Sequence, residues 1–293
     1  STFNLKPPCI FYIGSPDGIL MSGPLGNIQT TNRNYFNRIG SYKFIFNGTV
    51  PQSTGDAFPT IFDGGKKGVI EIANPSGVTL TNSITLNESG SSLNVLNNGK
   101  LIMNNGQQII GNSGTQFTLN SGGSISVEDY MQNNFSGINT YFSSAANYEF
   151  RNTHTGEFLT LPDTNTVNHL TFSNTSDNTL DQRFIVKGNL TLGGNLILNH
   201  KSLTLQGDFF NSSTYGFSGS DQDSLIVNGN GGTLSDNILF TSGNNFLTYL
   251  KVDRPGSDIV LGSDLSVTGV FPSIIVLTGS HLIAKSLSYT HTH

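Results

Sequence analysis

Five apolar residues recur every eight positions in the middle of the chain: Leu93, Leu101, Ile109, Phe117 and Ile125. Four of them have a second apolar residue two positions further on, namely Val95, Met103, Leu119 and Val127. Such an i, i+2 pair places both side chains on the same face of a β-strand. Short strands at a fixed spacing are typical of solenoids, in which successive turns of the chain stack on one another.

The gaps between these pairs are filled by glycine and asparagine, as in Gly90, Asn97-Asn98-Gly99, Gly106, Gly114 and Gly122. Both residue types tolerate the positive φ of a tight corner, so the sequence predicts an alternation of short strand and corner. No segment has a convincing helical period. Residues 128–142 come closest, but Asn133, Asn134 and Gly137 interrupt them.

The composition agrees with stacked strands. Charged residues make up 11% of the chain, against roughly 25% in a typical globular domain. Hydrophobic residues make up 35%, including 20 Phe, so the chain can bury a core and is not predicted to be disordered. An uncharged polar surface suits this architecture, because stacked strands would otherwise hold like charges about 4.8 Å apart.

Charge and hydropathy exclude two classes of partner. The net charge is −5 and the basic residues are scattered, so we expect no nucleic-acid binding. No apolar run approaches the roughly 20 residues of a membrane span.

The single cysteine, Cys9, cannot form an internal disulfide and is expected to be a buried or partly buried thiol. The low Lys and Glu content, together with many Asn and Thr, favours an extracellular location.

The sequence also contains a second repeat, which is much longer than eight residues. Three segments can be aligned on one another: 68–86, 168–186 and 248–267. The alignment brings apolar positions into register, beginning with Ile70, Leu170 and Leu250. Residues 1–40 fit this pattern poorly and are interpreted as an N-terminal cap or the tail of a preceding unit. We therefore predict three β-solenoid repeats, in residues 41–140, 141–220 and 221–293.

The fold class predicted from these patterns is all-β, a parallel β-helix with roughly 16 to 25 residues per turn. Tandem immunoglobulin-like β-sandwiches are the alternative, because the three segments are spaced by about the length of one such domain. The sandwich is disfavoured by the short, evenly spaced strands. The chain also lacks the Cys…Trp…Cys pattern of immunoglobulin cores, since it has no Trp.

Three stretches resemble the repeats of large extracellular adhesins of Bacteroidetes, which are exported by type IX secretion and include those of gliding bacteria. They are residues 42–55, 184–198 and 258–269. The resemblance implies an exported, adhesive surface protein and carries over no catalytic residue. Proteins of this kind usually end in a conserved C-terminal sorting domain. None is recognisable here, so we expect a fragment or a processed chain.

Candidates for chemistry are few. The densest acidic group is Asp221-Gln222-Asp223, which is interpreted as a solvated polar turn or as a weak calcium site. The other acidic residues are dispersed, and Asp253-Arg254 is interpreted as an ordinary surface pair. No cofactor and no further metal site is expected. The histidines are expected to be exposed or half-packed: His154, His169, His200, His281, His291 and His293.

Two further sets of residues bear on glycans. A carbohydrate-binding module would line aromatic side chains along a groove, and the first candidates are Tyr130, Tyr141, Phe142 and Tyr148. Glycosylation sequons occur at Asn47, Asn87, Asn134, Asn174, Asn189 and Asn211. Asp223-Ser224-Leu225 resembles the O-glycosylation acceptor of exported Bacteroidetes proteins.

These observations predict a structural or adhesive extracellular repeat protein that forms a rigid rod or filament segment at the cell surface, and not an enzyme. Expected partners are glycans, cell-surface proteins or further copies of the chain. Two alternatives remain open, a carbohydrate-binding module and a polysaccharide-active β-helix enzyme. The enzyme would need several charged residues converging on one face.

Overall fold

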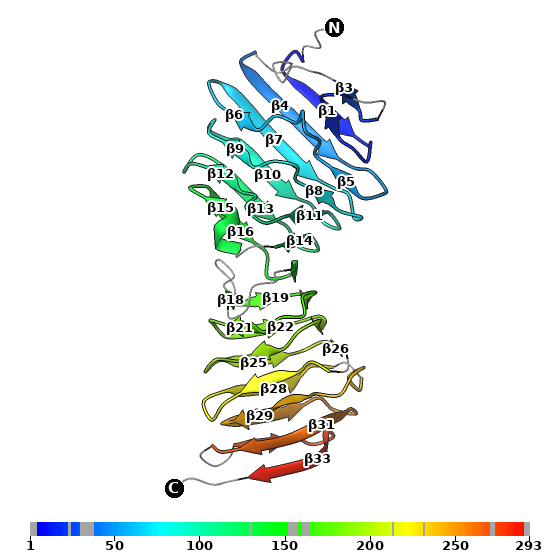
Figure 1. Ribbon diagram of the computed structural model, residues 1–293, viewed down its shortest axis with the longest axis vertical. Coiled ribbons are helices and arrows are strands. Elements are labelled where there is room, and N and C mark those ends of the chain that lie inside the picture. Colours follow the sequence, from blue (N-terminus) through cyan, green and yellow to red (C-terminus); the bar gives the residue numbers. More distant parts are fainter. Residues whose placement is uncertain are drawn as a thin grey trace. The chain divides into compact units, whose positions relative to one another are not determined.

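The chain is a parallel β-solenoid (Figure 1). The computed structural model describes residues 5–22, 25–29, 38–128, 131–151, 157–159, 165–212, 214–230, 232–269 and 273–289. All pairings between the described strands are parallel, and the chain divides into two compact units, Ser1–Asn147 and Tyr148–His293. The all-β solenoid prediction is confirmed. The sandwich alternative is wrong, because sandwiches are built from antiparallel sheets.

Helix plays little part in the described residues. The 3-10 helix η2 (Met131–Asn134) falls within the segment that has the closest approach to a helical pattern in the sequence. Among all the residues that the structure describes, no helix has the length and apolar character needed to cross a membrane.

Each turn of the first unit contributes one strand to each of three parallel sheets. The first sheet contains β1 (Cys9–Ile13), β4 (Gly40–Phe46), β7 (Lys66–Ile72), β10 (Ser92–Val95), β13 (Gln116–Leu119) and β16 (Asn139–Phe142). The second contains β5 (Gln52–Ser53), β8 (Val78–Thr79), β11 (Lys100–Met103) and β14 (Ser124–Val127). The third contains β6 (Ile61–Phe62), β9 (Ile84–Leu86), β12 (Ile109–Gly111) and β15 (Phe135–Ser136).

The eight-residue pattern is the strand-to-strand distance along one turn. Its five residues fall on β10, β11, β12, β13 and β14 in order, and each is fully buried. Because a turn has three strands, residues one turn apart are separated by three such steps. Leu93 therefore lies opposite Phe117, 24 residues further on, and Leu101 lies opposite Ile125. The stacked residues form continuous apolar columns inside the solenoid.

Aromatic rings fill the widest parts of this core. Phe44 packs against Phe58 and Phe62, with ring centroids 5.1 Å and 6.1 Å apart. Further along the unit, Phe117 packs against Phe135 at 4.5 Å. Such pairs contribute roughly 0.5–1.5 kcal/mol beyond the area that they bury.

Buried amides hold the corners together and explain much of the asparagine content. Asn74 is fully buried. Its amide nitrogen donates hydrogen bonds to the Val50 carbonyl oxygen (2.7 Å) and to Oε1 of Gln52 (2.9 Å), both in the preceding turn. Its Oδ1 accepts a hydrogen bond from the backbone N–H of Ser76 at 2.8 Å. At Gly99 the backbone approaches the Ile72 carbonyl so closely that an added Cβ would overlap its oxygen. These corners leave few buried polar groups unpaired.

The N-terminal part of unit 1 departs from the regular turn. β1 pairs with β4, but Cys9 lies opposite Tyr42, 33 residues further on. Two short strands, β2 (Ile19–Leu20) and β3 (Ile28–Gln29), pair with each other. The outward side chains of β1 are exposed, at 58% for Ile10 and 60% for Tyr12. Cys9 is a free, partly buried thiol, as predicted, and its burial raises its pKa.

The second unit also begins with three strands per turn. One sheet contains β17 (Asn147–Phe150), β20 (Leu170–Phe172), β23 (Leu190–Leu192) and β26 (Phe209–Asn211). Another contains β18 (Glu157–Leu159), β21 (Asn178–Leu180), β24 (Leu196–Ile197), β27 (Phe217–Gly219), β29 (Phe240–Leu247), β31 (Asp258–Val267) and β33 (His281–Tyr289). The third contains β19 (Thr166–Val167), β22 (Phe184–Val186), β25 (Ser202–Leu205), β28 (Ser224–Asn228), β30 (Tyr249–Asp253) and β32 (Ile274–Val276).

The turn changes after β26, where the first of these three sheets ends. From β28 onward the chain alternates between only two sheets, and the strands β29, β31 and β33 lengthen to 8, 10 and 9 residues. From β4 to the last turn, paired residues are between 18 and 26 positions apart, as for Asn178 with Leu196 and Phe44 with Ile70.

The three residues that head the longer sequence repeat all point into the core. Ile70, Leu170 and Leu250 lie on β7, β20 and β30, and all are buried. Within the second unit, β20 and β30 belong to different sheets. The repeat boundaries 41–140, 141–220 and 221–293 stay a prediction, and the compact division falls between Asn147 and Tyr148.

Candidate functional site

Asp223 is a buried corner residue. It is 1% exposed, and its carboxylate accepts hydrogen bonds from the backbone N–H groups of Lys201 (3.0 Å) and Ser220 (2.6 Å) and from the Ser220 hydroxyl (2.8 Å). The interpretation as a solvated turn is therefore wrong for Asp223 and fits the exposed Asp221 and Gln222. Among the residues described by the structure, no three His, Cys, Asp or Glu side chains gather as a metal site would require.

Arg254 is also buried, so its interpretation as part of a surface pair is wrong. Its side chain is among the largest fully buried ones, and the residue is 2% exposed. Nε donates to the Gly232 carbonyl oxygen (2.8 Å), and Nη1 donates to those of Gly207 (2.7 Å) and Asn228 (3.4 Å). The guanidinium thus joins the corner after β30 to the corners after β25 and β28. The neighbouring Asp253 forms an ion pair with Lys251 at 3.0 Å.

Asp208 balances the charge of this buried guanidinium. Burial lowers the pKa of Arg254, and the carboxylate of Asp208 opposes that effect. Burial alone would raise the pKa of Asp208. Two hydrogen bonds from Ser235, one from the Phe209 backbone and the charge of Arg254 together hold that pKa below its ordinary value.

The lowered pKa of Asp208 predicts an acid-sensitive stability. A carboxyl group with a lowered folded-state pKa stabilises the protein above its unfolded pKa of about 3.9, and this contribution is lost as the pH falls through the folded-state pKa. We expect Asp208→Asn to flatten the fall in the midpoint of urea unfolding between about pH 5 and pH 3. Asp253→Asn, at a partly exposed ion pair, is the control. If the unfolding midpoint of Asp208→Asn fell with pH as steeply as that of the native protein, the stabilising role of the Asp208 carboxylate would be contradicted.

The described histidines serve separate local contacts. Nδ1 of His169 accepts a hydrogen bond from the Asn189 backbone N–H at 2.8 Å. Nδ1 of His281 lies 2.8 Å from Oδ1 of Asp258, and Nδ1 of His200 lies 3.3 Å from Oγ of Ser220. His154, His291 and His293 lie outside the described residues.

The aromatic residues expected to line a groove do not assemble into one. Tyr148 is 1% exposed, and burial raises its pKa. Phe142 packs against Phe117 and Phe135, with centroids 5.5 Å apart in both pairs. Only Tyr141 is solvent-exposed, at 55%, while Tyr130 lies outside the described residues.

The sequons divide by exposure. Asn47 and Asn87 are exposed and Asn189 and Asn211 are half-buried. Asn134 and Asn174 are 0% and 6% exposed, so neither side chain is accessible to a glycan-transferring enzyme in the folded state. Ser224, in the O-glycosylation-like stretch, is half-buried on β28.

The most irregular part of unit 2 is the sheet that contains β27, β29, β31 and β33. Phe217 and Gly219 on β27 pair with Phe240 and Asn245 on β29, so β29 has three extra residues in this interval. One strand further on, Leu261 and Asp264 pair with Ala284 and Ser286, which leaves one extra residue in β31. The excess residues leave the ladder as β-bulges, which re-aim side chains.

Ser, Gly and Asn residues make the larger bulge possible. Residues 241–245 read Thr-Ser-Gly-Asn-Asn, and Gly243 has a φ of +83°. These types have low strand propensity and accept bends, so the chain leaves the ladder after Phe240 and returns to it at Asn245, which pairs with Gly219. Ser242, Gly243 and Asn244 are exposed as a result.

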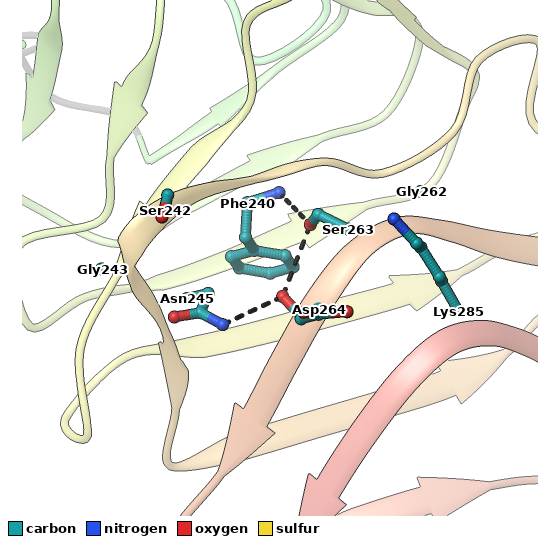
Figure 2. A pocket seen from close by; sticks show the side chains of 8 residues that line it. All are labelled: Phe240, Ser242, Gly243, Asn245, Gly262, Ser263, Asp264 and Lys285. Atoms are coloured by element: carbon teal, nitrogen blue, oxygen red, sulfur yellow. Dashed lines mark hydrogen bonds between the residues drawn. The ribbon is translucent and has the colours of Figure 1, made fainter.

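The first bulge pocket lies between the two bulges (Figure 2) and has a volume of about 270 Å³. It is lined by Phe240, Ser242, Gly243, Asn245, Gly262, Ser263, Asp264 and Lys285. The Ser263 hydroxyl accepts a hydrogen bond from the Phe240 N–H (2.7 Å), and the Asn245 amide donates one to the Asp264 carbonyl oxygen (3.2 Å). Figure 2 shows Lys285 extending from β33 toward β31.

Polar groups remain available in this pocket. Within the described residues, no hydrogen bond or ion pair engages the Asp264 carboxylate or the Lys285 ammonium. The pocket therefore presents one acceptor-only group and one donor-only group next to a neutral amide and hydroxyl.

The second bulge pocket, on the β27 side of the same strand, has a volume of about 420 Å³ and is lined by Gly219, Ser220, Asp221, Asn244, Phe246 and Thr268. Phe246 is 39% exposed. Oγ1 of Thr268 is buried and has no hydrogen-bond partner among the described residues.

Asp221 was singled out from the sequence, but as a partner of Asp223, which lies in the core. Sequence analysis missed the rest of both pockets. The available signal was Ser263, a polar residue at the position between Leu261 and Leu265 where the two-residue strand alternation would place an apolar one.

No protein-family model, no curated protein and no solved structure matches the chain.

Proposed function

We propose that this chain is a non-catalytic, extracellular scaffold that binds glycans through the two bulge pockets. The observation that supports this most directly is the chemistry of the pocket linings. They hold a carboxylate and an ammonium without a partner among the described residues, together with hydroxyl and amide groups and an exposed aromatic ring. Sugars offer many hydroxyl groups and apolar C–H faces, so pockets with a few convergent polar groups and an aromatic surface suit them.

The rest of the molecule supports a scaffold. Stacked turns bury one another's apolar columns, which favours a stiff and regular body. The outward faces are mostly uncharged, as on β10 and β13, where Asn94 bonds Ser92 and Gln116 bonds Thr118. The resemblance of the repeats to secreted adhesins and the low content of charged residues favour a place at the cell surface.

Binding to a panel of immobilised polysaccharides tests the proposal. We expect the intact chain to bind at least one neutral, acidic or amino-sugar polymer. Both Phe246→Ala and Asp264→Asn should weaken that binding about tenfold, because an aromatic contact contributes about 0.5–1.5 kcal/mol and a charge-assisted hydrogen bond about 1.5–3 kcal/mol. Tyr141→Ala is the matched control, since it removes an exposed aromatic ring outside both pockets. Binding that is lost with Tyr141 but not with Phe246 would refute the site.

A polysaccharide-active enzyme is the second candidate, favoured by one observation. Asp264 and Lys285 line the same pocket, and a carboxyl with an amine can act as an acid–base pair. The two proposals differ in what happens to the polymer. A binding protein leaves chain length unchanged during prolonged incubation. Shorter products that disappear in Asp264→Asn while binding persists would favour the enzyme.

A further inference from the structure

The two bulge pockets lie on opposite sides of a single strand. Asn244 lines the second pocket, and the next residue, Asn245, lines the first. Because neighbouring residues of an extended chain are about 3.8 Å apart, the pockets are separated by little more than the width of β29. A ligand longer than one sugar can therefore reach both pockets by crossing the exposed residues of the bulge.

The charges around the pockets favour an uncharged ligand. In the first pocket Asp264 and Lys285 have opposite formal charges, while the lining of the second contains Asp221 and no cation. The nearest charges along β31 and β33 are Asp258 and His281, which are paired at 2.8 Å. An anionic sugar would face the Asp221 carboxylate without a compensating cation there. For a cationic sugar in the first pocket, the Lys285 ammonium opposes the attraction of the Asp264 carboxylate, and only Asp221 in the second pocket would attract it unopposed.

The second pocket provides the stacking surface. Phe246 stands on the outer face of β29, opposite Ser266 of β31, with 39% of its surface exposed. An aromatic face of this kind packs against the C–H face of a pyranose ring.

We propose that the two pockets are adjacent subsites of one groove for a neutral oligosaccharide of at least two sugars. One sugar stacks on Phe246, and the next is held by Asp264, Lys285 and Asn245. The inference rests on the proposed glycan binding and specifies its ligand class and minimum length.

The experiment measures affinity by titration calorimetry for two series of probes. The first is a length series, from monosaccharide to hexasaccharide, of neutral glucose, mannose, galactose and N-acetylglucosamine oligomers. The second contains polygalacturonate, alginate and chitosan oligomers of matched length. The intact protein is compared with Phe246→Ala, Phe246→Tyr and Asp264→Asn, and with Tyr141→Ala as the control. Circular dichroism checks that each variant is folded.

We expect a neutral series to bind, with affinity rising at least tenfold from the monosaccharide to the di- or trisaccharide. Phe246→Ala and Asp264→Asn should each reduce the affinity for the trisaccharide about tenfold, and Phe246→Tyr, which keeps the ring, should restore it. Should Phe246→Ala fail to fold, the length series and Phe246→Tyr still decide the matter.

Each other outcome has one meaning. Binding confined to the uronate or chitosan probes overturns the neutral class while leaving glycan binding in place. Equal affinity for monosaccharide and trisaccharide overturns the two-subsite groove. Absence of binding to every probe at millimolar concentration overturns both the groove and the proposed function.

Discussion

Arg254→Ala should lower the free energy of unfolding of the second unit by about 3–5 kcal/mol, the range for removing one partner from a buried charged network. In the native protein the guanidinium bonds the carbonyl oxygens of Gln206, Gly207, Asn228 and Gly232. Alanine removes the guanidinium donors from these acceptors and opens a cavity between three stacked corners. A buried polar group left without a partner costs about 1–3 kcal/mol.

Two further variants separate charge from geometry. Arg254→Lys keeps the positive charge but loses the planar set of donors, so we expect an intermediate loss of stability. Lys251→Ala removes one partner of a partly exposed ion pair only three residues away and should cost less than about 1 kcal/mol.

Amide hydrogen exchange is the best measurement for this prediction, because it reports on each strand separately. Exchange in β25, β28 and β30 should become faster in Arg254→Ala, since the arginine joins the corners that follow these strands. If the amides of these three strands stayed as protected from exchange as in the native protein, water or neighbouring groups would have to replace the guanidinium without loss of stability.

Phe117→Ala should destabilise the first unit by about 3–5 kcal/mol, the usual cost of removing a phenylalanine from a packed core. Phe117 is fully buried on β13, between Leu93 of the preceding turn and the rings of Phe135 and Phe142. The side chain contacts three successive turns, so its loss leaves a cavity that no single neighbour can fill.

The matched control lies one residue further along the same strand. Thr118 points outward and is half-buried, and its hydroxyl accepts a hydrogen bond from the side chain of Gln116. Thr118→Ala should change the midpoint of thermal unfolding little, as surface substitutions usually stay within about 0.5 kcal/mol. If both variants lowered the midpoint equally, the assignment of inward and outward faces on β13 would be wrong.

The fold could be predicted from the sequence because the solenoid repeats one physical rule. Each strand alternates inward and outward side chains, and each corner needs residues such as Gly99 and Asn98, so both patterns recur at the strand spacing. Three eight-residue steps from Leu93 to Phe117 give one turn, although the sequence alone did not fix three strands rather than two. The change to two strands per turn after β26 leaves no comparable periodic signal.

The candidate site was harder to predict because it arises where the pattern fails. Asp264 and Lys285 are about one turn apart in sequence, and only the stacking of β31 on β33 brings them to one pocket. Two charged residues were wrongly interpreted as lying on the surface. Asp223 and Arg254 carry charges, which usually indicate surface, yet both are satisfied by backbone groups of neighbouring corners. Composition cannot reveal such partners, since backbone donors and acceptors occur at every residue.

The stacking of turns also governs how such a body would yield to tension. Residues of β10 and β13 that pair lie 24 positions apart, so detaching one turn frees a loop of that length without disturbing turns further away. Each release would lengthen the chain by roughly 80 Å at full extension. A pulled solenoid of this kind dissipates work in many small steps, which lets a tether stretch under load while its remaining turns stay folded.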